Sequence, residues 1–318
     1  MRVAVTGGTG FVGGHLAVAL SRAGHEVVLV ARGVDRRPWA QEVLALPGVS
    51  QFRAGLDDAG RLGQAFTGCE AVAHCAGINR EIGTATYQAV HVDGTRNAVR
   101  AAESAGVRRF SIVSFLRARP HPASAYHDSK WVAEDIVRSS DLEWTVLKPG
   151  MMYGRGDHML DHLSKALSTF PIYVGVGNRR VRPLAIDDAV RVLEAALVGR
   201  RLTRQTVPIA GPTELSFDDA ARLVARVIGK KRLFVRAPIA FHYLLARISE
   251  ALMAVPLIAR AQVKILEEEL VEATNAPDPL PEDLAPAIPF DEDSIRRGLP
   301  DRVERFGRAD FRRRAARG

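Results

Sequence analysis

The chain has 318 residues, 47% of them hydrophobic and 25% charged, and its formal net charge is +8. This composition is that of a soluble globular protein, and it excludes a fibrous or largely disordered chain. No apolar stretch reaches the ~18 residues of a membrane span, and an apolar strand already begins at residue 2, so we expect no secretory or transit signal. The two cysteines, Cys69 and Cys75, match neither a zinc site nor a redox pair, which favours free thiols in a cytoplasmic protein.

Strand-like and helix-like segments alternate along the first half of the chain. Strands are predicted at residues 2–6, 26–31, 49–54, 71–74, 109–114 and 144–148. Helical patterns fall between them, at residues 14–22, 62–66, 95–105 and 129–138. This alternation predicts an α/β fold, a doubly wound parallel Rossmann sheet whose ligands lie beyond the carboxyl ends of the strands.

The alternation becomes less regular after Pro149. A helix at 188–197 and a strand at 206–210 are followed by a helical pattern at 216–228. Ser216 stands three residues before an aspartate at the start of that last pattern, which predicts an N-terminal cap.

These patterns predict two interleaved regions. Residues 1–165 form the dinucleotide-binding Rossmann domain, to which a strand and a helix return around 182–212. Residues 166–318 form a smaller, mostly helical substrate-binding region that ends in a basic tail at 301–318. We interpret the tail as solvated, and since no nucleic-acid-binding motif accompanies it we expect no nucleic-acid partner.

A glycine loop joins the first strand to the first helix, with the spacing G-x-x-G-x-x-G. Glycines let the backbone approach a pyrophosphate, and the helix N-terminus offers free N–H groups to that anion. The loop therefore predicts dinucleotide binding. The residues expected to contact the cofactor here are Gly7, Thr9, Gly10, Phe11, Val12 and Gly13.

The end of the second strand indicates which dinucleotide binds. Arg32 stands where an NAD-selective site usually carries Asp or Glu, and Arg36 and Arg37 follow. A guanidinium cannot accept a hydrogen bond from a ribose 2′-OH, but it pairs well with a 2′-phosphate. We therefore predict NADP(H) in preference to NAD(H); the alternative is that Arg32 is only a solvated loop cation.

A Y-x-x-x-K pattern supplies candidate catalytic residues. Tyr126 and Lys130 are four residues apart, so on a helix they project from the same face. Because an ammonium one turn away favours a phenolate, we expect Lys130 to lower the pKa of Tyr126, and also to reach ribose hydroxyls of the cofactor. Ser114, after the fifth strand, is the candidate for orienting the substrate oxygen, with Ser124 as a rival.

Taken together, these motifs resemble the short-chain dehydrogenase/reductase (SDR) superfamily, on its extended or atypical, epimerase/dehydratase-like branch, over roughly residues 1 to 230. Within that branch the chain is most similar to the subgroup of the SDR-fold accessory subunit of respiratory complex I. The segments that carry the resemblance are the glycine loop, 74–77, 92–95, Tyr126 with Lys130, 149–150, 182–188, 210–212 and 215–228.

The resemblance implies further cofactor contacts. Those after the fourth strand are Cys75, Ala76 and Gly77, and those that pass close to the nicotinamide are Pro149, Gly150, Met151 and Met152. Gly55 departs from the family pattern, since it replaces an adenine-contacting Asp. Leu56 and Asp57 are the candidates for that contact, and whether Asp57 replaces the missing carboxylate is left open. His91 also departs from the pattern, because it replaces an asparagine and weakens a proton-relay role.

The first functional hypothesis is an NADP(H)-dependent oxidoreductase that transfers a hydride to or from a carbonyl or alcohol, quinone-like substrates included. The second is a non-catalytic NADPH-binding accessory or sensor protein. A weaker third is a sugar-nucleotide epimerase or dehydratase. We expect a small-molecule substrate and a cytoplasmic location; association with a membrane periphery or a complex, and oligomerisation, are left open.

Two further patterns lie outside these motifs. His158 and His162 lie one helical turn apart but lack a third ligand, so we predict no metal site. A helical pattern at 241–255 carries an apolar stripe, which fits either a membrane surface, helped by nearby arginines, or the roof of a substrate pocket; we favour the roof. The stripe is Phe241, Leu244, Leu245, Ile248, Leu252 and Val255, and the arginines are Arg236, Arg247 and Arg260.

Overall fold

The computed structural model describes residues 1–33, 38–121, 123–253, 256, 258–307 and 310. The chain folds into two compact units, each built from three stretches of sequence. The first unit contains Met1–Pro149, Ile186–Ile209 and Ala273–Ala285. The second contains Gly150–Ala185, Ala210–Glu272 and Pro286–Gly318.

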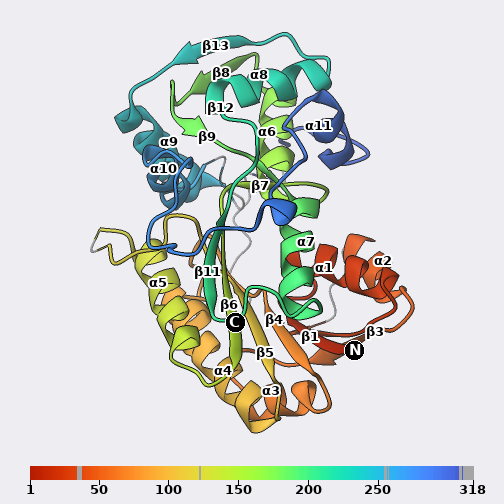
Figure 1. The fold of residues 1–318 in the computed structure, drawn as a ribbon. Coiled ribbons are helices and arrows are strands. Elements are labelled where there is room, and N and C mark those ends of the chain that lie inside the picture. The colour runs from red at the N-terminus through yellow and green to blue at the C-terminus, as the bar shows by residue number, and fades with distance from the viewer. Residues whose placement is uncertain (34–37, 122, 254–255, 257, 308–309, 311–318) are drawn as a thin grey trace. The chain divides into compact units, whose positions relative to one another are not determined.

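The first unit is a parallel sheet between two layers of helices (Figure 1). Its seven strands follow the order β11-β6-β5-β4-β1-β2-β3. They are β1 (Arg2–Thr6), β2 (Glu26–Ala31), β3 (Val49–Arg53), β4 (Ala71–His74), β5 (Arg109–Val113), β6 (Glu143–Pro149) and β11 (Gln205–Ile209). The doubly wound Rossmann fold is confirmed, and the six early strands agree with their predicted limits to within one residue.

The helices of the first unit form two groups that pack on opposite faces of the sheet. One group is α1 (Phe11–Arg22), α2 (Pro38–Leu44) and α7 (Ile186–Leu197). The other is α3 (Ala59–Phe66), α4 (Gly94–Ser104) and α5 (Ala125–Arg138), with the π-helix η1 (Gln88–Asp93) running directly into α4. Since both faces are covered, a central strand such as β5 is buried along its whole length.

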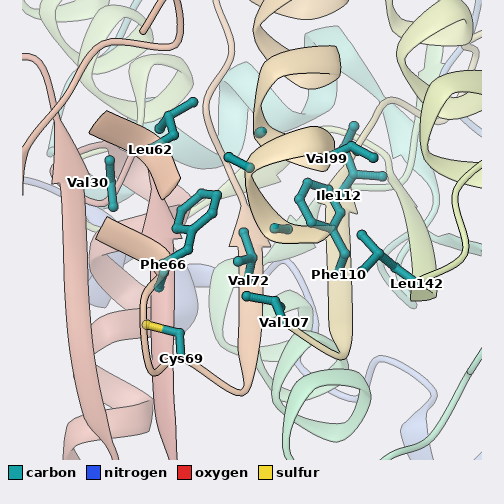
Figure 2. Packing of buried hydrophobic residues seen from close by; sticks show 14 of the residues in the cluster. Val30, Leu62, Phe66, Cys69, Val72, Val99, Val107, Phe110, Ile112 and Leu142 are labelled. Carbon is teal, nitrogen blue, oxygen red and sulfur yellow. The ribbon is translucent and has the colours of Figure 1, made fainter. Parts of the chain in front are cut away.

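A hydrophobic cluster holds α3, α4 and α5 on the sheet (Figure 2). Phe66 of α3 points toward the sheet, where Val30 of β2 and Val72 of β4 lie. Phe66 and Phe110 of β5 are both 0% exposed. Burying each such ring is worth roughly 1.5–3 kcal/mol, so this cluster gives the strand ends, and the loops that leave them, a rigid base.

The second unit is built from short strand pairs and helices. The strands pair as β7 (Met152–Tyr153) with β10 (Leu184–Ala185), β8 (Ile172–Gly175) with β13 (Leu233–Arg236), and β9 (Arg180–Val181) with β12 (Leu215–Ser216). The helices are α6 (His158–Thr169), α8 (Phe217–Val227), α9 (Ile239–Leu252), α10 (Arg260–Glu267) and α11 (Glu292–Gly298). The predicted cap of α8 is confirmed, because the Ser216 hydroxyl oxygen accepts the Asp219 N–H at 3.0 Å.

The C-terminal stretches return to both units. Residues 276–289 contain the short 3-10 helix η2 (Glu282–Leu284), and the Asp278 carboxylate accepts the Thr206 N–H of β11 at 2.7 Å. The basic tail contacts α6. The Phe306 ring centre lies 4.8 Å from Nζ of Lys165, and Asp310 pairs with the same ammonium at 3.0 Å. The arginines beyond Gly307 lie outside the described residues. In the described part of the chain, no helix has the length and apolar content needed to cross a membrane.

Candidate cofactor and active site

The glycine loop in the first unit is shaped by two close backbone approaches. Gly7 has φ +66°, and a Cβ on it would lie 2.8 Å from the Cα of Ala76. A Cβ on Gly13 would lie 2.5 Å from the Gly7 carbonyl oxygen. Helix α1 begins after Gly10, with no side-chain cap and no acidic residue in its first turn. The loop therefore presents unobstructed N–H groups at a positive helix end, which fits a pyrophosphate.

Three arginines gather at the carboxyl ends of β2 and β3. Arg32 is exposed, and its carbonyl oxygen accepts the Nε–H of Arg53 at 3.0 Å. The Arg53 carbonyl in turn accepts the Nε–H of Arg61 at 2.9 Å. Sequence reasoning found Arg32 but missed the other two, although an arginine at the end of the strand paired with β2 was a usable signal. The predicted Arg36 and Arg37 lie outside the described residues.

The space beside Gly55 is filled by Asp57. A Cβ on Gly55 would overlap the Asp57 Oδ1 atom and lie 3.7 Å from Cγ of Arg32. The Asp57 carboxylate therefore occupies the position from which a side chain at residue 55 would start. Leu56 points elsewhere: its side chain packs on Gly94, and its carbonyl accepts an amide hydrogen of Asn97 at 2.8 Å.

The loop after β4 lies between the glycine loop and α5. The Cys75 N–H donates to the Thr6 carbonyl at 3.1 Å, and Ala76 contacts Gly7 as described. A Cβ on Gly77 would lie 3.2 Å from Nζ of Lys130. Burial raises the pKa of the Cys75 thiol to about 12, so this cysteine is not a nucleophile.

Tyr126 and Lys130 are both buried on α5. The Tyr126 ring lies edge-on to Phe115 and Tyr87, with centroid distances of 5.3 and 5.6 Å. Desolvation by this environment raises the pKa of Tyr126, which is opposite to the shift expected from the sequence. Lys130 donates from Nζ to the Val113 carbonyl at 3.1 Å, and burial lowers its pKa to about 8. The phenol is therefore neutral and the amine retains its proton at neutral pH.

Both candidate serines bind internal partners. The Ser114 hydroxyl donates to the carboxylate of Glu134, which is fully buried. Lys148, also fully buried, donates to the two oxygens of that carboxylate at 2.8 and 3.1 Å. Ser124 lies 2.6 Å from Nδ1 of His127. The Ser114 proton that would orient a substrate oxygen is thus held by a buried ion pair.

A buried chain of hydrogen bonds leads from β1 to η1. The Thr95 hydroxyl donates to the His91 carbonyl at 2.5 Å, so it accepts the Nε2–H of His74 at 3.2 Å. Nδ1 of His74 therefore accepts the Thr6 hydroxyl at 2.8 Å. Burial lowers the pKa of His74 to about 3, which keeps this ring neutral. Thr6 directly precedes the glycine loop, so the chain ties that loop to the start of α4.

His91 continues this chain to α5. Its Nε2 accepts the Ile78 N–H at 3.1 Å, so its Nδ1–H donates to the Ser129 hydroxyl at 2.9 Å, and Ser129 donates to the Tyr126 carbonyl at 3.0 Å. Burial and the Lys130 charge lower the pKa of His91 to about 2. The histidine that replaces the family asparagine thus anchors the helix of Tyr126; the π-helical turn that carries it was not predicted.

The remaining predicted residues lie at the end of β6. Pro149 ends this strand, and its carbonyl accepts the Leu116 N–H at 2.9 Å. Gly150, Met151 and Met152 belong to the second unit, where the Met151 carbonyl accepts the Leu184 N–H at 2.8 Å. Their approach to the nicotinamide stays a prediction. Among the described residues, no cluster of three or more His, Cys, Asp or Glu side chains is arranged to hold a metal ion.

Sequence comparisons place these features in a family. A family model described as NAD(P)H-binding matches residues 7–167. A ceramide reductase of Caulobacter vibrioides is 32% identical over 247 residues, covering 74% of this chain and 73% of the reductase. The 40 kDa subunit of mitochondrial NADH-ubiquinone oxidoreductase from Neurospora crassa is 24% identical over 235 residues, covering 74% of this chain and 62% of the subunit. An uncharacterized Mycobacterium tuberculosis protein is 29% identical over 241 residues, and the match covers 75% of this chain but only 24% of that protein.

Solved structures share the fold. UDP-glucuronic acid 4-epimerase from Bacillus cereus, in complex with UDP-glucuronic acid and NAD, has a TM-score of 0.69 at 18% identity, covering 94% of this chain and 98% of the epimerase. NADPH-dependent quinone oxidoreductase from Escherichia coli, in complex with NADPH, has a TM-score of 0.68 at 19% identity, covering 92% and 98%. The chain therefore belongs to the NAD(P)H-binding proteins of the extended short-chain dehydrogenase/reductase superfamily.

Proposed function

We propose that the chain is an NADP(H)-dependent oxidoreductase that transfers a hydride to or from a small carbonyl or alcohol, quinone-like substrates included. One observation carries the proposal. A Cβ on Gly7 would lie 2.8 Å from Cα of Ala76, and a Cβ on the residue after it, Gly77, would lie 3.2 Å from Nζ of Lys130, so the loop after β4 lies between the glycine loop and Lys130. A dinucleotide seated on the loop therefore extends toward the helix that carries Tyr126, one turn before Lys130.

The protonation states favour the reductive direction. When bound, NADPH supplies the hydride to the carbonyl carbon of the substrate. Tyr126, neutral because it is buried, donates its phenolic proton to the carbonyl oxygen, and the alcohol forms. The Lys130 ammonium one turn away stabilises the tyrosinate that remains, until water returns the proton. Ser114, whose own proton is donated to Glu134, has no hydrogen to offer the substrate carbonyl; it can only accept a hydrogen bond from the hydroxyl of the alcohol that forms.

The preference for NADP(H) is supported by the arginines at the ends of β2 and β3. Arg32, Arg53 and Arg61 bring three guanidinium groups to one strand edge, linked through backbone carbonyls. Guanidinium groups pair with phosphate oxygens through charge-assisted hydrogen bonds. Asp57, whose carboxylate lies over Gly55, is assigned the adenine contact in place of the family Asp.

Oxidation of NADPH against a panel of aldehydes, ketones and quinones tests the proposal. Tyr126→Phe should lower kcat by roughly 10²–10⁴-fold, the usual contribution of a general acid, with little change in NADPH affinity. Tyr87→Phe is the matched control, because it removes a hydroxyl that donates to the Asn79 carbonyl beside the same ring cluster. Equal turnover by wild type and Tyr126→Phe would rule out the assigned role.

A non-catalytic NADPH-binding accessory protein is the second candidate. The donation of the Ser114 proton to Glu134 favours it, since this serine then lacks a proton for the substrate. A relative that is a subunit of NADH-ubiquinone oxidoreductase also favours it, and suggests association with a complex. Tight NADPH binding, with no turnover of this panel and no conversion of UDP-sugars tested beside it, would select this candidate over both the oxidoreductase and the epimerase.

A further inference from the structure

Helix α9 exposes its large apolar side chains and buries its small and polar ones. Its exposed residues are Phe241 (42%), Leu244 (55%), Ile248 (48%) and Leu252 (60%). Its buried residues are His242, Ala246 and Ser249. A surface helix ordinarily shows the opposite pattern, with the apolar stripe toward the core. The stripe that the sequence favoured as a pocket roof therefore faces solvent at four of its positions; Val255 lies outside the described residues.

Specific contacts hold α9 in this orientation. On its inner face, Nε2 of His242 lies 3.3 Å from the Val174 carbonyl of β8. The Ser249 hydroxyl donates to the Ile258 carbonyl at 2.7 Å. Rotating the apolar stripe inward would carry His242 and Ser249 out to solvent and would take these partners from the Val174 and Ile258 carbonyls. The outward stripe is thus a feature of the folded unit.

The adjacent strand pair exposes a second apolar set. Ile172 of β8 and Leu233 of β13 are directly paired and are 49% and 61% exposed; Val235, two residues on, is 42% exposed. Residues i and i+2 of a strand share a face. The alternate residues Tyr173 and Phe234 pack in the core of the second unit, with ring centroids 5.1 Å apart. We call this strand face and the α9 stripe the apolar surface.

The segment that contains β13 and most of α9 carries charges of one sign. Between Lys230 and Ser249 the chain carries five cations and no carboxylate: Lys230, Lys231, Arg232, Arg236 and Arg247. Nearby carboxylates have partners: Asp218 lies 3.8 Å from Arg236, Glu250 lies 2.8 Å from Arg260, and Glu267 of α10 lies 3.5 Å from Lys264 and accepts the hydroxyl of Tyr243 of α9 at 2.9 Å. Exposed apolar side chains beside a segment with an excess of cations match the chemistry of an anionic bilayer surface, with acyl chains below and phosphates above.

We propose that the apolar surface of the second unit docks on the surface of a bilayer that contains anionic lipids. Leu244 and Ile248 enter the acyl boundary, and Lys231, Arg236 and Arg247, all exposed, contact lipid phosphates. A second copy of this chain fits less well. A two-fold interface places the same surface on both partners, so the cations would face cations. Peripheral docking also needs no membrane-spanning helix, and the described residues contain none.

Flotation of the full chain with vesicles tests this docking. Binding to phosphatidylcholine vesicles containing phosphatidylglycerol should exceed binding to pure phosphatidylcholine by about tenfold or more, and should weaken with salt. The double variant Leu244→Glu/Ile248→Glu should lower the binding affinity by about tenfold or more, because two apolar contacts are lost and two anions are added. Circular dichroism and NADPH binding check that the variant is folded.

Ile82→Glu is the matched control, because Ile82 is 62% exposed and lies in the first unit. It should bind vesicles like the wild type.

Lys230→Glu/Lys231→Glu should abolish the preference for phosphatidylglycerol. Absence of vesicle binding, unchanged binding by the Leu244/Ile248 variant, or equal binding to both lipids would overturn the proposal. So would a drop in oligomer mass in that variant without vesicle binding, which would assign the surface to a second copy.

Discussion

Desolvation sets the protonation states at the candidate active site, residue by residue. Burial makes His74 and His91 neutral, with pKa values of about 3 and 2, and keeps Tyr126 a neutral phenol. Lys130 retains a charge below its pKa of about 8, supported by the Val113 carbonyl. The site therefore offers one proton donor and one cation, which suits protonation of a developing alkoxide better than deprotonation of an alcohol.

Cofactor preference is decided at the same scale. Arg32→Ala/Arg53→Ala should weaken NADPH binding by roughly 10- to 100-fold, because hydrogen bonds to a charged group contribute about 1.5–3 kcal/mol each. NADH, which lacks the 2′-phosphate, should bind unchanged. Isothermal titration calorimetry with NADPH and with NADH measures the two dissociation constants. Arg22→Ala, in the last turn of α1, controls for the loss of positive charge; equal losses for NADPH and NADH would contradict the assignment.

At the scale of single elements, caps and turns position the candidate site and its surroundings. The π-helical turn η1 places His91 between Ile78 and Ser129, where a regular helix would alter the register of the residues that follow. In the second unit, Asp157 caps α6 by accepting the N–H of Leu160 at 2.7 Å and the N–H of Gly154 at 2.8 Å. Burial of this carboxyl raises its pKa to about 7.

The Asp157 cap predicts a pH dependence of stability. Because its folded pKa lies above the ordinary value of 3.8, the folded state binds the proton more tightly than the unfolded state, so this group's contribution falls as pH rises from 4 through 7. Asp157→Asn stays neutral and retains a capping oxygen. Urea unfolding at pH 5 and pH 8 should therefore show that the wild type loses more stability than the variant over this interval. Parallel changes in the two proteins would refute the prediction.

At the scale of the whole molecule, the parallel sheet brings the loops after β1, β2, β3 and β4 to one edge of the first unit. The glycine loop, the arginines and the loop 75–77 converge there although they are far apart in sequence. This is the edge at which doubly wound sheets bind ligands. The second unit contains the apolar surface and a separate core around α6 and α8.

Cofactor binding should stabilise these units unequally. At about 100 times its Kd, NADPH should add about 2.7 kcal/mol to the free energy of unfolding of the unit that binds it. Hydrogen exchange should slow at residues 3–14 and 71–77 of the first unit, while residues 215–236 of the second serve as an internal control. Protection confined to the control residues would contradict the placement of the cofactor on the glycine loop.

The sequence by itself determined the strands of the parallel sheet, most of the helices that pack on it and the cofactor class, because these follow from local patterns. Strand limits depend on short apolar runs, and the turn within the glycine loop depends on residues close in sequence, since a Cβ on Gly13 would lie 2.5 Å from the Gly7 carbonyl oxygen. The cap of α8 likewise depends on two residues one turn apart.

Only the tertiary structure decided those properties of the site that depend on contacts between residues far apart in the sequence. Burial from several elements reversed the expected pKa shift of Tyr126. The approach of Arg53 to Arg32 and of Ser114 to Glu134 depends on how strands and helices meet. The same holds for α9, where periodicity shows an apolar face but cannot say whether that face packs inward; the contacts of His242 and Ser249 turned it toward solvent.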